Sequence, residues 1–183
     1  MKNIFKSAAV AAVVCLAGIA QATTVSGNIG FTGQVNLDTA SVGTATKVVS
    51  WVNTAVNGDD GSFAGIAANT PASFAGATPW SFNSGALAAF WTTSGFTFNL
   101  TSSLIAIQTG TFLGVTGTGF VSGNGYTATP FSWSFTAQNP AVNGPQTFTF
   151  SASTNAVPDG GTTAALLGCS LVGLGFVRRK MVA

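Results

Sequence analysis

The sequence contains no histidine and very little cysteine. Its two cysteines, Cys15 and Cys169, lie near the chain ends, so the section between residues 23 and 156 has none. Histidine is the commonest general base and metal ligand, and the cysteine thiolate is a strong nucleophile. The section between the ends therefore lacks the usual groups for acid–base, metal and thiol chemistry, and it cannot contain a disulfide.

Charged residues are scarce as well, at 5% of the chain against about 25% in an ordinary protein. Between residues 23 and 156, Lys47 stands against Asp38, Asp59 and Asp60, a net charge of −2 that offers no basic surface to a nucleic acid. A serine or threonine nucleophile would have only Lys47 as its base. A pair of catalytic carboxylates would have to include Asp38, because the other two are neighbours in the chain. We therefore expect no enzymatic activity, no cofactor and no nucleic-acid partner.

The N-terminal end, residues 1–22, has the pattern of a secretory signal peptide. Two lysines precede an apolar stretch over residues 8–19, which is too short to span a membrane stably. Ala20 and Ala22 then form a cleavage site of small residues for signal peptidase. The mature chain is expected to begin at Thr23.

The C-terminal end, residues 157–183, has three parts. A short motif combines a stiff proline with glycines that leave the backbone open to an enzyme. Residues 162–177 are uncharged and span about 24 Å as a helix, which is marginal for a bilayer core of about 30 Å. A basic stop follows, which the positive-inside rule places in the cytoplasm. The motif is Val157, Pro158, Asp159, Gly160 and Gly161, and the basic stop is Arg178, Arg179 and Lys180.

This order of motif, apolar span and basic tail resembles the PEP-CTERM class of sorting domains. The residues of the motif are most similar to those of the VPDSG-CTERM variant. The resemblance implies recognition by an exosortase, a multi-pass membrane transpeptidase, in a Gram-negative bacterium with an exopolysaccharide-rich envelope. It also implies secretion through the inner membrane, transient anchoring by the C-terminal helix and delivery to the cell surface. Position 160 departs from the variant, because it is glycine where the variant has serine.

The middle section, residues 23–156, alternates apolar and polar residues at period two, which places one face of each strand in a core. Turn-forming clusters of Gly, Asn, Asp and Pro separate the alternating runs. The pattern predicts an all-β domain, a single antiparallel β-sandwich or a barrel-like form, flanked by the signal helix and the transmembrane helix. The alternating residues include Val25, Ile29, Phe31, Val35, Leu37, Phe96, Phe98, Leu100, Phe131, Trp133, Phe135, Phe148, Phe150 and Ala152.

Two binding sites can be proposed in this section. Trp80 and Tyr126 lie near turn-like sequence and could stack on sugar rings, whereas tryptophans in alternating strands usually belong to the core. Asn57, Asp59 and Asp60 could supply oxygen ligands to calcium. The competing interpretation of these three residues is a surface turn, because Asn-Gly and Asp-Gly are common turn formers.

The function expected from the sequence is that of an exported, non-enzymatic surface or extracellular-matrix protein with a structural or adhesive role in the envelope or biofilm. A carbohydrate-binding module for exopolysaccharide is the first alternative. An outer-membrane β-barrel is the second, since low charge and alternation suit one. Signal peptidase, exosortase and the membrane are the expected partners during export, and exopolysaccharide is a further candidate.

Overall fold

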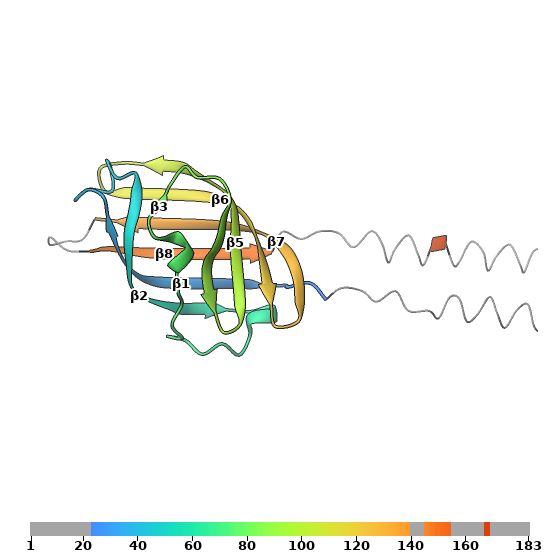
Figure 1. The fold of residues 1–183 in the computed structure, drawn as a ribbon. Helices are drawn as coiled ribbons and strands as arrows, with labels where there is room; N and C mark the ends of the chain where they lie inside the picture. Colours follow the sequence, from blue (N-terminus) through green and yellow to red (C-terminus); the bar gives the residue numbers. More distant parts are fainter. Residues whose placement is uncertain (1–22, 140–144, 155–166, 169–183) are drawn as a thin grey trace, which may run out of the picture.

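The computed structural model describes residues 23–139, 145–154 and 167–168 of the chain (Figure 1). The predicted signal peptide, sorting motif, basic stop and nearly all of the apolar span lie outside these residues. Thr23, the expected first residue after cleavage, is exposed, and its carbonyl accepts a hydrogen bond from the Thr127 backbone N–H at 2.9 Å.

The domain is a single curled sheet of eight strands, in which every neighbouring pair is antiparallel. The strand order is β3-β2-β1-β8-β7-β6-β5-β4, so the first and last long strands, β1 and β8, pair in the middle. The prediction of an all-β domain is confirmed, and the structure has the barrel-like form rather than two separate sheets. The elements are β1 Asn28–Leu37, β2 Lys47–Asp59, η1 Gly61–Phe63, η2 Ala75–Ala77, β3 Trp80–Ser81, β4 Leu87–Thr93, β5 Phe96–Gln108, β6 Phe112–Gly123, β7 Tyr126–Gln138 and β8 Gln146–Thr154.

A short extended segment lies between the two open sides of the curled sheet. Pro71 pairs with Ala55 of β2, and Ser73 pairs with Thr92 of β4. The backbone N–H of Ser73 donates to the carbonyl of Thr92 at 2.9 Å, and Thr92 returns a hydrogen bond at 2.8 Å. These bonds satisfy edge groups of both strands that would otherwise be left unpaired. The sheet is thereby bridged into a half-barrel whose interior is separated from solvent.

The interior is filled by aromatic side chains. Inward residues follow the predicted alternation, as in β8, where Phe148, Phe150 and Ala152 are buried and the residues between them are exposed. Aromatic rings in such a core gain from edge-to-face and offset packing as well as from burial. The largest fully buried aromatic residues are Trp80, Trp91, Phe31, Phe63, Phe82, Phe90, Phe98, Phe131, Phe135 and Phe150.

One stretch folds differently from the turn interpretation of the sequence. The surface turn considered for Asn57, Asp59 and Asp60 is wrong at its start, because β2 continues to Asp59 and pairs there with Ile29 of β1. The stretch from 61 to 77 has a short 3₁₀ helix at each end. Phe63 and Phe74 are both buried in it, so it packs as a lid of the core.

The two ends of the described domain meet at one end of the half-barrel. The N–H of Thr154, the last residue of β8, donates to the carbonyl of Gly27 at 3.0 Å, just before β1 begins. β1 then runs away from this point for ten residues, about 30 Å at 3.3 Å per residue. The loop after β1 and the turn after β5 therefore lie at the opposite end, where Ser41 Oγ reaches the carbonyl of Gly110.

Candidate functional site

The structure places the two predicted sugar-stacking residues differently. Trp80 is 1% exposed, and its ring packs edge-to-face against Phe82, Phe90 and Phe135 at centroid distances of 5.0–5.4 Å. The prediction for Trp80 is therefore wrong, because a ring sealed in the core cannot stack on a sugar. Tyr126 is half-buried at the start of β7 and stacks on Phe96 at 6.0 Å.

The three residues of the calcium hypothesis have different surroundings in the structure. The carboxylate of Asp60 binds the first residue of β1. One of its oxygens accepts a hydrogen bond from the backbone N–H of Asn28 at 2.7 Å, and the other accepts one from the side-chain amide of Asn28. Asn57 is exposed two residues before the end of β2, and Asp59 is half-buried opposite Ile29. Over the described parts of the chain, no group of three or more His, Cys, Asp or Glu side chains is close enough to hold a metal ion.

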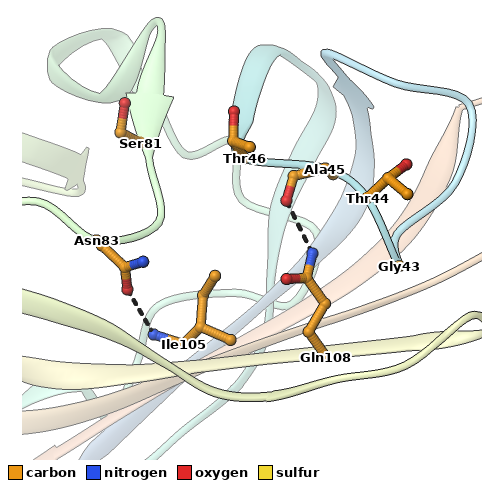
Figure 2. Close-up of a pocket in the computed structure, with 8 residues that line it drawn as sticks. All are labelled: Gly43, Thr44, Ala45, Thr46, Ser81, Asn83, Ile105 and Gln108. Atoms are coloured by element: carbon orange, nitrogen blue, oxygen red, sulfur yellow. Dashed lines mark hydrogen bonds between the residues drawn. The ribbon is translucent and has the colours of Figure 1, made fainter.

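A separate hollow lies at the end of the half-barrel opposite Thr154, and we call it the end pocket (Figure 2). Its volume is about 370 Å³, within the range of about 300–1,000 Å³ that is typical of small-molecule sites. The loop between β1 and β2, the segment around β3 and the second half of β5 surround it. Its lining residues are Gly43, Thr44, Ala45, Thr46, Ser81, Asn83, Ile105 and Gln108.

Two amide side chains in the end pocket have fixed orientations. Asn83 Oδ1 accepts the backbone N–H of Ile105 at 3.0 Å, so this atom must be the oxygen. Gln108 Nε2 donates to the carbonyls of Val42 and Ala45 at 2.7 and 2.8 Å, so this atom must be the nitrogen. These bonds use only one polar atom of each amide. The second polar atom is a donor in Asn83, Nδ2, and an acceptor in Gln108, Oε1. Figure 2 shows these two atoms on either side of Ile105.

A carboxylate supports the rim of the end pocket without lining it. Asp38 accepts hydrogen bonds from the hydroxyl of Thr46 and from the backbone N–H groups of Thr46 and Lys47, at 2.9 and 3.3 Å for the latter two. Desolvation by burial raises the pKa of Asp38, but these hydrogen bonds outweigh it, so the pKa lies below its ordinary value. Asp38 is thus ionised at neutral pH and holds the start of β2 against the loop.

The end pocket was not foreseen from the sequence. Asn83 lies in a turn-like run with Ser84 and Gly85, and no motif surrounds Gln108. Their chain separation is 25 positions, and each belongs to a segment that the curling of the sheet brings to the same end. The only available signal was their position directly beside turn residues, Asn83 before Ser84 and Gly85 and Gln108 before the Thr109–Gly110 turn.

The comparison with known families concerns the other end of the chain. Residues 156–181 match the VPDSG-CTERM motif. The chain thus carries a PEP-CTERM-like exosortase sorting signal, as the motif, apolar span and basic tail indicated, and the glycine at position 160 does not prevent the match. The motif implies export to the cell surface and processing by an exosortase. No curated protein and no solved structure matches the chain. Within the residues that the structure describes, no helix has the length and apolar character needed to cross a membrane.

Proposed function

We propose that the chain is a non-enzymatic surface protein whose β domain serves structure or adhesion in the cell envelope or biofilm matrix. The observation that carries the proposal is the VPDSG-CTERM signal at residues 156–181, directly after the last strand. A protein addressed in this way is delivered to the cell surface. Export would remove the signal peptide after Ala22, and exosortase would act at the motif around Asp159.

The absence of an enzymatic role is part of the proposal, and the chemistry of the sequence supports it. The domain has no histidine or cysteine, and its only basic side chain, Lys47, is exposed at the start of β2. Asp38 is occupied by Thr46 and the adjoining backbone, and Asp60 by Asn28. Asp38 does accept the hydroxyl of Thr46, but the same carboxylate is held by two backbone N–H groups and its pKa is lowered, which makes it a poor base.

The outer face of the sheet supports a role in contact rather than catalysis. The four outward residues of β8, Thr147, Thr149, Ser151 and Ser153, are all exposed and all carry a hydroxyl. In the register of the sheet they are flanked by hydroxyls of β7, because Thr149 pairs with Thr136 and Ser151 with Ser134. The row of hydroxyl side chains continues onto β6 at Thr116 and Thr118. Such a surface is neutral and hydrogen-bonding, which suits a hydrated polymer matrix better than a charged partner.

The experiment that tests the sorting part is intact-mass analysis with terminal peptide mapping of the protein recovered from the bacterium that produces it. We expect a chain that begins at Thr23 and ends between Val157 and Gly161. D159A should leave the C-terminal segment attached, whereas K47Q, which changes a charge in the β domain, should be processed normally. Recovery of residues 178–183 in the mature wild-type protein would show that the tail is an ordinary anchor and would refute exosortase processing.

The adhesive part needs its own measurement, which is the cohesion of the biofilm under shear. A strain that lacks the gene should lose cells at a lower shear stress than the parent, and the wild-type chain should restore the parental value. Equal cohesion in all three strains would refute the structural role while leaving the sorting result intact. A carbohydrate-binding module is the second candidate function, and the end pocket is the observation that favours it.

A further inference from the structure

We propose that the end pocket binds a neutral saccharide, with Asn83 Nδ2 donating to one hydroxyl of the sugar and Gln108 Oε1 accepting from another. This inference rests on the proposed function, because the envelope matrix is the source of the saccharide. The residues concerned are not the aromatic residues that the sequence suggested. Trp80 adjoins Ser81 but its ring is buried in the core, and Tyr126 lies at the other end of the domain, at the start of β7.

The first argument is that the pocket offers a donor and an acceptor that are already held in place. Each amide is anchored at one end by the backbone, Asn83 by Ile105 and Gln108 by Val42 and Ala45. Neither free end has a protein partner among the described residues, and both face the same hollow. A sugar hydroxyl both donates and accepts, so neighbouring hydroxyls on one ring can satisfy the two amides at once. Anchoring also lowers the entropy lost when the ligand binds.

The second argument is the absence of charge in the lining. None of the eight lining residues is ionisable, and the hydroxyls of Thr44, Thr46 and Ser81 add further neutral hydrogen-bonding groups. The nearest carboxylate, Asp38, already accepts three hydrogen bonds from Thr46 and Lys47. Lys47, whose backbone pairs with Ser81, is the one basic side chain between residues 23 and 156, and the ionised Asp38 beside it offsets its charge toward an anion. A neutral sugar needs no counter-charge there.

The third argument is the apolar surface between the two amides. Ile105 is half-buried and packs against the core, and Figure 2 places it between Asn83 and Gln108. Pyranose rings have C–H groups on their faces and hydroxyls around their rim. A ring seated over Ile105 can therefore place its C–H face on the side chain while its rim reaches the amides.

The fourth argument is the position of the pocket. The C-terminal segment leaves the domain after Thr154, beside Gly27, whereas the pocket lies beyond the other end of β1, about 30 Å away. A domain still tethered through its C-terminal segment would thus present the pocket at the end farthest from its point of attachment. That end is the one that reaches the surrounding polymer.

The experiment is a calorimetric titration of the protein as it is purified from its host, with oligosaccharides from the host's own exopolysaccharide. Mild acid hydrolysis yields the fragments, and anion exchange separates a neutral pool from an acidic pool. We expect saturable binding of the neutral pool and at least tenfold weaker binding of the acidic pool. Failure of the neutral pool to bind at millimolar concentration, or equal binding of both pools, would overturn the proposal.

The decisive variant is N83D. The carboxylate keeps an oxygen for the N–H of Ile105 but replaces the donor Nδ2 by an acceptor, and we expect at least tenfold weaker binding of the neutral pool. N53D is the matched control, because it makes the same change at an exposed position of β2, and its affinity should stay within twofold of wild type. Unchanged binding by N83D would refute the assigned role of this amide.

A second variant covers the case in which N83D does not fold. S81L places an apolar side chain at the exposed rim of the pocket and leaves the amide hydrogen bonds intact, and it should also weaken binding at least tenfold. Unchanged binding by S81L would count against the site. These titrations do not depend on processing at Asp159, so their failure would leave the terminal peptide map, and the sorting proposal, unaffected.

Discussion

Phe150 lies at the centre of the aromatic core, and its replacement by alanine tests the packing of the whole domain. Its side chain is fully buried on the inner face of β8. Rings from five different segments surround it at centroid distances of 5.5–6.3 Å, namely Phe31, Phe74, Phe90, Phe98 and Trp133. Because these rings belong to separate strands and to the 61–77 stretch, they cannot all move inward to fill the space that F150A would leave.

The expected cost follows from that geometry. Truncation of a buried phenylalanine to alanine destabilises a protein by about 3–5 kcal/mol, and the cost is highest where the cavity cannot collapse. We therefore expect F150A to lower the free energy of unfolding by about 4–5 kcal/mol. F150L keeps most of the volume and loses the aromatic contacts, so its cost should be about 1.5 kcal/mol.

Urea unfolding followed by tryptophan fluorescence measures these costs. With a slope of about 2 kcal/mol per molar urea, F150A should lower the midpoint by about 2 M and F150L by about 0.7 M. T149A is the matched control, because Thr149 is the exposed neighbour on the same strand, and it should change stability by less than about 0.5 kcal/mol. If F150A and T149A shifted the midpoint equally, the assignment of the inner face of β8 would be wrong. F150L keeps the test open if F150A does not fold.

Two further predictions concern the backbone and the rim of the end pocket. G117A should destabilise the domain by about 2–3 kcal/mol in thermal unfolding, because a Cβ there would overlap a carbonyl of β5 and lie 2.7 Å from Trp133 Cζ2; G85A, with open space around its Cβ, should have no such effect. The folded pKa of Asp38 lies below the unfolded value of about 3.9, so its stabilisation is present above that pH and is lost as the pH falls through the folded pKa. D38N should therefore remove part of the difference in stability between pH 6 and pH 3. An identical pH profile for wild type and D38N would refute the role given to the hydrogen bonds from Thr46.

The strands were predictable because their signal is local. Period-two alternation correctly assigned the inner faces of β1, β7 and β8. The error at Trp80 has a local cause too: β3 has only two residues, too few to show a period. Phe82, two positions later and also fully buried, was the one neighbour that pointed to an inward face.

The closure of the sheet and the end pocket depend on long-range pairing, which alternation does not report. Nothing near Pro71 and Ser73 indicates that this segment lies between β2 and β4. The end pocket depends in turn on the curling of the sheet, because its lining combines the loop around residue 45 with Asn83 and Gln108. Neutral amide and hydroxyl side chains form no recognisable sequence motif. Their capacity to bind a ligand can be judged only when the structure shows which of their atoms already hydrogen-bond to the backbone.

The topology also suits the proposed removal of a segment from each end of the domain. Thr23 is held on β7 through Thr127, and Thr154 is paired with Phe131 on the same strand. Both ends of the described domain therefore lie in the first half of β7. Among the residues that the structure describes, the buried cluster runs from Val25 to Ala152. The central pairing of β1 with β8 thus leaves the far end of the half-barrel, where the end pocket lies, free of both ends of the described domain.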